Sequence, residues 1–190
     1  MKFSTSPIVL ATALALAACQ TPSLPPRLPQ SLQVTAQETW IGTLSARGVQ
    51  IYECRSRAGQ PGWDLVAPDA DLFRNGGQPF GHHGAGPSWQ AEDGSLVVGN
   101  VLARADAPVA GAIPWLLLEA RSNSGKGALA GVARIRRVNT TGGVAPVAGC
   151  DAQSRGQQVR VPYTADYVLY AVYPARSDRA VDAVAVQASV

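Results

Sequence analysis

The sequence of 190 residues is poor in charged side chains, in histidine and in cysteine. Charged residues make up only 15% of the chain and apolar residues 46%, so the composition excludes a disordered protein and can supply a core. The net charge is +3, and the cations are scattered along the chain. Nucleic acid is therefore not an expected partner.

The N-terminal apolar run is too short to cross a bilayer as a helix. It covers residues 8–18, is interrupted only by Thr12, and has about half the length that a spanning helix needs. Lys2 precedes the run and Ala17-Ala18-Cys19 ends it, an order that is typical of a signal peptide. A cysteine directly after small residues is the lipoprotein pattern, so we expect residues 1–18 to be removed and Cys19 to carry the lipid. The alternative is an ordinary secretory signal with Cys19 there by chance.

Residues 19–33 contain four prolines and predict a tether that packs neither as helix nor as strand. A binding motif for the groove of a partner is the alternative. Because Gln20, not an aspartate, follows Cys19, we expect the lipid anchor in the outer membrane, facing the periplasm. The membrane is then a partner through this anchor, and residues 34–190 form a single β-rich domain.

Two cysteines, Cys54 and Cys150, remain after Cys19, and no CxxC motif is present. In an oxidising compartment an even pair predicts a disulfide. Closing a loop of nearly a hundred residues would stabilise the fold by up to ~4.7 kcal/mol in the chain-entropy model. Two free thiols or a metal-binding pair are the alternatives, although a single pair is a poor metal signature.

No long segment has helical periodicity, and short β-rich runs recur between Gly, Pro, Asn and Asp residues. Asp93-Gly94 is typical of a hairpin turn and residues 139–146 of a loop, while the part from Arg176 onward fits a last strand or a short helix. We predict an all-β fold, an antiparallel sandwich or closed barrel of short strands with one disulfide. The predicted strands are 50–55, 63–66, 96–103, 114–120, 129–138 and 159–173.

Both histidines lie in the glycine-rich segment 81–89, which predicts a shaped, functional loop. Its candidate functional residues are His82, His83 and Trp89, with Asp93 close by in the sequence. His83 and Asp93 could serve a metal or an acid–base site, but two adjacent histidines tend to point to opposite sides of an extended chain. A structural His83 that bonds to a loop carbonyl is the alternative. We therefore predict no metal and no cofactor. If a metal ion did bind, His83 and Asp93 would be its candidate ligands.

A basic segment ends at Arg137, which alternates onto the same face as the apolar Ile135. If Ile135 points into the core, Arg137 does too, and a buried guanidinium needs a carboxylate. We predict that Arg137 forms a structural lock with one of three partners, which are Glu119, Asp93 and Asp166. The alternative is an anion-binding arginine in a pocket.

Several ordered motifs between about residues 50 and 173 resemble a bacterial and fungal family of secreted proteins, domain of unknown function number 3455. The resemblance implies an exported β-rich domain with cysteines at the positions of Cys54 and Cys150, and it carries no activity. The motifs are His83-Gly84-Ala85-Gly86-Pro87-Ser88-Trp89, Asp93-Gly94-Ser95, Ile113-Pro114-Trp115-Leu116-Leu117, Arg137-Val138-Asn139-Thr140 and Val161-Pro162-Tyr163-Thr164-Ala165-Asp166-Tyr167.

The expected function is a non-catalytic one, a β-domain that binds a ligand or an envelope protein at the membrane surface. An enzyme usually gathers titratable groups in a cleft, and this chain has few of them outside its acids and arginines. The alternative is a metal-dependent or hydrolytic enzyme centred on the His83 loop, in which His83 opens to a pocket with carboxylates. A carrier with an apolar cavity in a hollow barrel is a third possibility.

Overall fold

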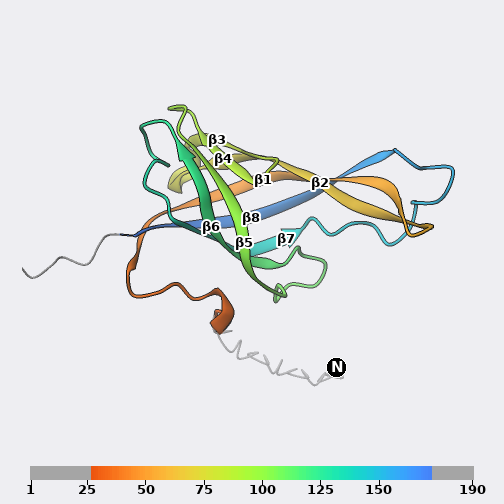
Figure 1. Cartoon of the computed structure of the whole chain (residues 1–190), viewed down its shortest axis with the longest axis horizontal. Coiled ribbons are helices and arrows are strands. Elements are labelled where there is room, and N and C mark those ends of the chain that lie inside the picture. Colours follow the sequence, from red (N-terminus) through yellow and green to blue (C-terminus); the bar gives the residue numbers. More distant parts are fainter. Residues whose placement is uncertain (1–26, 173–190) are drawn as a thin grey trace, which may run out of the picture.

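The computed structural model describes residues 27–172 as an all-β fold (Figure 1). Eight antiparallel strands follow one another around a closed barrel, and β1 closes it by pairing with β8. This confirms the predicted all-β class and decides for the barrel over the sandwich. The strands are β1 (Glu38–Arg57), β2 (Gln60–Phe73), β3 (Pro79–Gly84), β4 (Ser88–Ala91), β5 (Leu96–Ala105), β6 (Trp115–Ser124), β7 (Arg134–Gly142) and β8 (Gln158–Val172).

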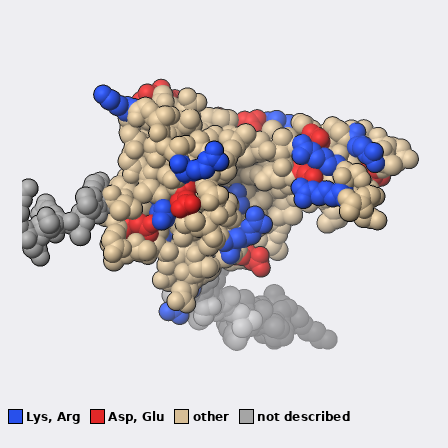
Figure 2. Space-filling model, viewed as in Figure 1, with Lys and Arg blue, Asp and Glu red and all other residues tan. Residues whose placement is uncertain are grey.

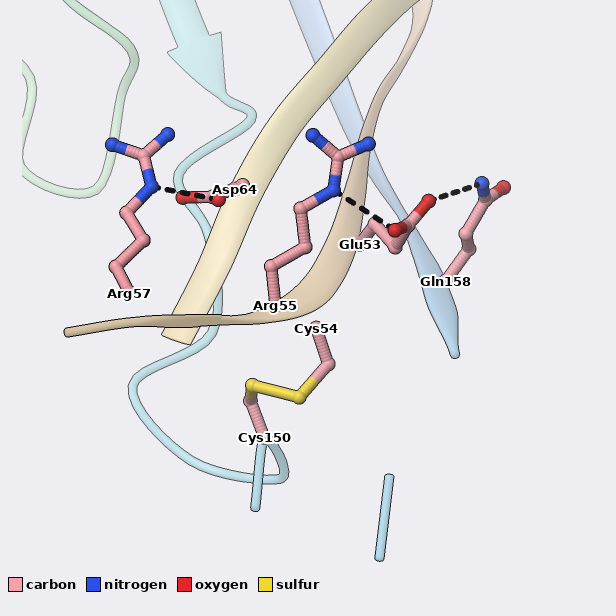
Figure 3. A network of polar contacts seen from close by, with 7 residues as sticks. All are labelled: Glu53, Cys54, Arg55, Arg57, Asp64, Cys150 and Gln158. Atoms are coloured by element: carbon pink, nitrogen blue, oxygen red, sulfur yellow. Dashed lines mark hydrogen bonds and ion pairs between the residues drawn. A yellow bond between two sulfur atoms is a disulfide. The ribbon is translucent and has the colours of Figure 1, made fainter. Parts of the chain in front are cut away.

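One end of β1 and β2 projects from the barrel as an arm, residues 53–64, beside the start of β8 (Figure 1). Ala58 and Gly59 turn the chain at its tip, both with positive φ, as a two-residue hairpin turn requires. At the arm the predicted disulfide is present and joins Cys54 to Cys150 (Figure 3). It pins the loop between β7 and β8 against the arm.

The barrel interior is filled by side chains from every strand, because alternate residues of each strand point inward. Trp89, Tyr167 and Ile135 are at most 1% exposed. The remaining large core side chains include Leu44, Leu72, Phe80, Leu116, Leu118, Tyr163 and Leu169.

The N-terminal segment packs on the outside of the barrel, which corrects part of the predicted tether. Gln30–Leu32 forms a short 3-10 helix, η1, that contacts β5 and β6. Leu32 is fully buried in an outer apolar cluster with Trp115 and Leu117. Proline did not prevent this docking, since apolar residues between the prolines have a matching apolar face to cover.

The strands differ from the predicted ones at several boundaries. Residues 129–133 are turn and coil, so β7 begins at Arg134, and it continues through Asn139–Gly142 where a loop was predicted. The predicted loop 81–89 is a tight hairpin of β3 and β4. The Asp93-Gly94 turn is confirmed between β4 and β5.

The segment from Arg176 onward and the cleavage site at Cys19 lie outside the described residues. Among residues 27–172 there is no helix with the length and apolar character that crossing a membrane requires.

Candidate functional site

A pocket opens in the side of the barrel between β2 and β5. It arises because the β3–β4 hairpin, which lies between these two strands, is shorter than they are. The β3 ladder on β2 begins only at Ala70, and the β4 ladder on β5 ends at Val98. Within the described residues, the stretches 60–69 of β2 and 100–105 of β5 therefore have no ladder partner on this side, and the two strands diverge (Figure 1). Gly86 and Pro87, in the turn between β3 and β4, line the opening.

We call this space the lateral pocket, and its volume is about 270 Å³. Its mouth is formed by β2, β5 and the β3–β4 turn, while side chains of β1, β3, β6 and β7 reach it from the barrel interior. Its walls are mainly apolar, and its charged side chains are both arginines. The lining residues are Gln50, Leu65, Val66, Ala67, Pro68, His83, Gly86, Pro87, Val101, Arg104, Leu116 and Arg137.

Arg137 points into the barrel, as the alternation with Ile135 predicts, but its predicted carboxylate lock is wrong. Its Nε and Nη2 donate to the carbonyl oxygen of Pro114 at 3.1 and 2.8 Å. No Asp or Glu within residues 27–172 forms an ion pair with it. The Pro114 carbonyl holds the guanidinium in place without neutralising its charge.

The three predicted partners of Arg137 have other contacts. Asn139 donates to Asp166 at 2.8 Å, and Asn100 donates to Glu119 at 3.3 Å. Asp93 accepts hydrogen bonds within its own turn and from the backbone N–H of Ala128 at 2.8 Å. Alternation along β7 predicted the direction of the arginine, but a partner on another strand depends on register, which alternation does not contain.

The positive charge of Arg137 acts electrostatically on several buried side chains of the barrel interior. Burial raises the pKa values of Tyr52, Tyr163 and Tyr167, and the guanidinium of Arg137 opposes that rise at each of them. The hydroxyl of Tyr52 donates to the carbonyl of Gly143 at 2.6 Å. The interior around Arg137 therefore contains neutral phenols that offer it no counter-charge.

Gln50 is the second polar side chain in the deep part of the lateral pocket. It is 2% exposed, and its Nε2 has no hydrogen-bond partner within the described structure. Buried amide donors are nearly always paired, so an unpaired one that lines a pocket is a donor available to a ligand. The sequence did not single out Gln50, because a lone glutamine in a strand has no distinctive pattern.

His83 lines the same pocket and is 2% exposed. Its Nδ1 lies 2.8 Å from the carbonyl oxygen of Ser88, which can only accept, so Nδ1 carries the proton in the neutral ring. The ring stacks on Trp89 with centroids 4.5 Å apart and meets Tyr167 at 4.8 Å. Desolvation lowers the pKa of His83 to about 3, and the nearby charge of Arg137 adds to this effect.

The other candidate residues of the segment lie elsewhere. His82 faces the outside, as adjacent residues of a strand do, with Nε2 3.3 Å from Asp69. Trp89 is buried core, and Asp93 organises its turn through Ser95. The structure therefore brings His83 to a pocket without Asp93, and none of the described carboxylates lines that pocket. Among residues 27–172, no three His, Cys, Asp or Glu side chains are grouped so as to hold a metal ion.

Polar contacts at the arm hold the strand ends and do not line the lateral pocket. Arg57 donates to Asp64 at 2.8 Å, and Glu53 accepts from Arg55 at 2.9 Å and from Gln158 at 3.4 Å (Figure 3). Over the face drawn in Figure 2, basic and acidic side chains alternate without one extended field of a single sign. This agrees with the scattered cations of the sequence.

Comparison with known proteins places the barrel in one family. The model of the family described as "Protein of unknown function (DUF3455)" matches residues 35–171. This range runs from just before β1 to the end of β8, so the match covers the whole barrel, and the resemblance seen in the sequence is confirmed. No curated protein and no solved structure matches the chain.

Proposed function

We propose a non-catalytic, ligand-binding function for this chain, which belongs to the DUF3455 family of proteins of unknown function. The ligand enters the barrel wall through the lateral pocket. The observation that carries the proposal is an open apolar mouth combined with two polar side chains further inside. Within residues 27–172, Gln50 Nε2 has no hydrogen-bond partner and Arg137 has no carboxylate partner. Apolar walls with a few convergent polar groups are typical of small-molecule sites.

The composition of the lateral pocket favours binding over acid–base catalysis. His83, with a pKa of about 3, is neutral near pH 7 and a weak base. A general base works best with a pKa near the working pH, and a hydrolytic site also needs a nucleophile or a carboxylate beside it. Neither lines this pocket. Ser95, a nucleophile near His83 in the sequence, is fully buried in the Asp93 turn.

We also propose that Cys19 anchors the barrel to the membrane by its lipid, in the outer membrane facing the periplasm. Nine residues, 19–27, separate the expected lipid from the docked segment that begins near Leu28. Such a chain spans at most about 30 Å, so the lateral pocket stays close to the membrane surface. Labelling with radioactive palmitate tests the anchor: wild type should be labelled and Cys19→Ser should not. A labelled Cys19→Ser chain would contradict it.

Binding at the lateral pocket can be tested with a neutral apolar probe, 1-hexanol, added to the Cys19→Ser protein. The backbone amide shifts should change around Ala67, Gly86 and His83 and saturate with one site. Val101→Trp should abolish this response, because Val101 lines the mouth and is 41% exposed. The matched control is Leu102→Trp, since Leu102 is its exposed neighbour outside the pocket lining. Shifts spread over the whole surface, or none at all, would overturn the proposal.

A further inference from the structure

We infer that the ligand of the lateral pocket is a small carboxylic acid with an apolar substituent, an inference that rests on the proposed function. The carboxylate lies against Arg137 and Gln50 in the deep part of the pocket. The apolar substituent lies toward the mouth, against Leu65 and Val101.

The charge of the pocket calls for an anion. Arg137 and Arg104 line it, and no Asp or Glu of residues 27–172 does. Arg137 is partly removed from water, and within residues 27–172 its hydrogen-bond partners are neutral groups, the carbonyl of Pro114 and the hydroxyl of Tyr167. The Pro114 carbonyl accepts from Nε and Nη2, and Tyr167 makes a further contact, which still leaves part of the five N–H groups of the guanidinium for a ligand. A carboxylate oxygen accepts them in a short, charge-assisted bond.

Gln50 supplies an independent second contact. Its side chain is 2% exposed, lines the pocket and has an Nε2 without a partner. A carboxylate has two oxygens, so one can accept from Arg137 while the other accepts from Gln50. A buried amide donor without a partner and a half-buried cation without a carboxylate line one cavity within the described residues, and one acceptor-only group can contact both.

The pocket fits one negative charge better than two. Apart from the exposed Arg104, the pocket has one guanidinium, that of Arg137. Behind the lining, the charge of Arg137 acts on Tyr52, Tyr163 and Tyr167, whose raised pKa values keep the phenols neutral. A dianionic phosphate would leave one charge without a partner in apolar surroundings, at a high desolvation cost. Arg104 is exposed at the mouth, where solvent screens it.

The mouth and the volume define the rest of the ligand. Leu65 and Val101 are 54% and 41% exposed on facing strands, so a ligand that covers them removes apolar surface from water. A volume of about 270 Å³ lies just below the range usual for drug-sized ligands, about 300–1,000 Å³. The ligand is therefore a short acid, and a long acyl chain would extend out of the mouth.

Three probes of one chain length test the inference on the Cys19→Ser protein: hexanoate, 1-hexanol and hexylamine. Amide shifts near Gly86 and Arg137 report binding. We expect hexanoate to bind at least tenfold more tightly than 1-hexanol, and hexylamine not to bind. Inorganic phosphate should bind more weakly than hexanoate, and phosphate binding as tight as hexanoate would overturn the carboxylate assignment.

Two neighbouring arginines give a matched pair of variants. Arg137→Gln should weaken hexanoate binding at least tenfold and leave 1-hexanol unchanged. Arg136→Gln should change neither, because Arg136 lies on the outer face and donates to Leu32 at 2.9 Å. If Arg137→Gln does not fold, Gln50→Glu tests the same contact. The new carboxylate should pair with Arg137, abolish the binding of hexanoate and leave the binding of 1-hexanol unchanged.

The outcomes separate this inference from the proposed function. If 1-hexanol binds in the pocket and hexanoate binds no more tightly, the inference of a carboxylic acid is wrong, while the proposed ligand-binding function is supported. If none of the probes shifts the pocket amides, both are wrong. Equal affinity of wild type and Gln50→Glu for hexanoate would also overturn the inference that the ligand is a carboxylic acid.

Discussion

Arg136 and Arg137 are neighbours on β7 that lie on opposite sides of the barrel wall. Arg136 donates to the carbonyl of Leu32 outside the barrel, and its guanidinium lies 4.9 Å from the ring centroid of Tyr170. Arg137 donates to the carbonyl of Pro114 and lines the lateral pocket. One arginine therefore helps to hold the N-terminal segment, while the other has no carboxylate partner in the part of the chain that the structure describes.

His83 should make the barrel less stable as the pH falls below neutrality. Its pKa is about 3 in the folded protein and near 6.5 when unfolded, so between these values the unfolded chain binds more protons. The stabilisation is complete above pH 6.5 and is lost as the pH falls toward 3. Each pH unit contributes about 1.4 kcal/mol, so the free energy of unfolding should drop by about 2 kcal/mol between pH 6.5 and 5.

Urea unfolding of two histidine variants over this pH range checks the effect. His83→Gln should be less stable at pH 7 and show a flatter profile, because its side chain does not titrate. His82→Gln is the control, since His82 is half exposed on the outer face, and it should keep the slope of wild type. A slope in His83→Gln equal to that of wild type would show that other groups cause the pH dependence.

Gly48 should not tolerate even a methyl group. A Cβ at this position would meet the backbone of Asp69 and Ala70 on the paired strand β2 at impossibly short range. We expect Gly48→Ala to lower the free energy of unfolding by about 1–3 kcal/mol, the usual cost of overpacking. Gly42→Ala, on the same strand with open space around its Cβ, should change it by less than about 1 kcal/mol. Thermal unfolding of both variants measures the difference. Equal melting temperatures would contradict the close packing of β1 on β2 at Gly48.

The docked N-terminal segment should stabilise the barrel from outside. Leu32 is fully buried against Trp115 and Leu117, and Leu→Ala substitutions at buried sites cost about 2–5 kcal/mol. A chain beginning at residue 27 should be more stable than one beginning at residue 35 by several kcal/mol, because only the longer chain contains Leu32. Trp115 should also become accessible to acrylamide quenching only in the shorter chain. Equal stability of the chains from residues 27 and 35 would show that the docking contributes nothing.

The disulfide should stabilise the fold and the arm together. Cys54 and Cys150 are 96 residues apart, so the chain-entropy model assigns the bond up to about 4.7 kcal/mol. Replacing both cysteines by serine should lower the free energy of unfolding by about 2–5 kcal/mol. Hydrogen exchange should rise most in the loop before β8, which the bond pins to the arm. Uniformly unchanged exchange in that loop would contradict a local role.

The strands of this protein could be predicted where a short apolar run follows turn residues, as Leu96–Ala103 follows Asp93-Gly94. The inward direction of Arg137 followed from its alternation with Ile135 along a pleated strand. The pairing of Cys54 with Cys150 followed from a count of two cysteines, since an even pair leaves one partner for each.

Closure of the barrel, in contrast, was decided only by the tertiary structure. It requires β1 to pair with β8 across most of the chain, and no local pattern distinguishes that pairing from a sandwich. The lateral pocket has the same origin. Gln50, Val101 and Arg137 become neighbours because β3 and β4 stop short of the ends of β2 and β5. The sequence determines what each strand buries, and the register between distant strands determines which polar groups are left without a partner in one cavity.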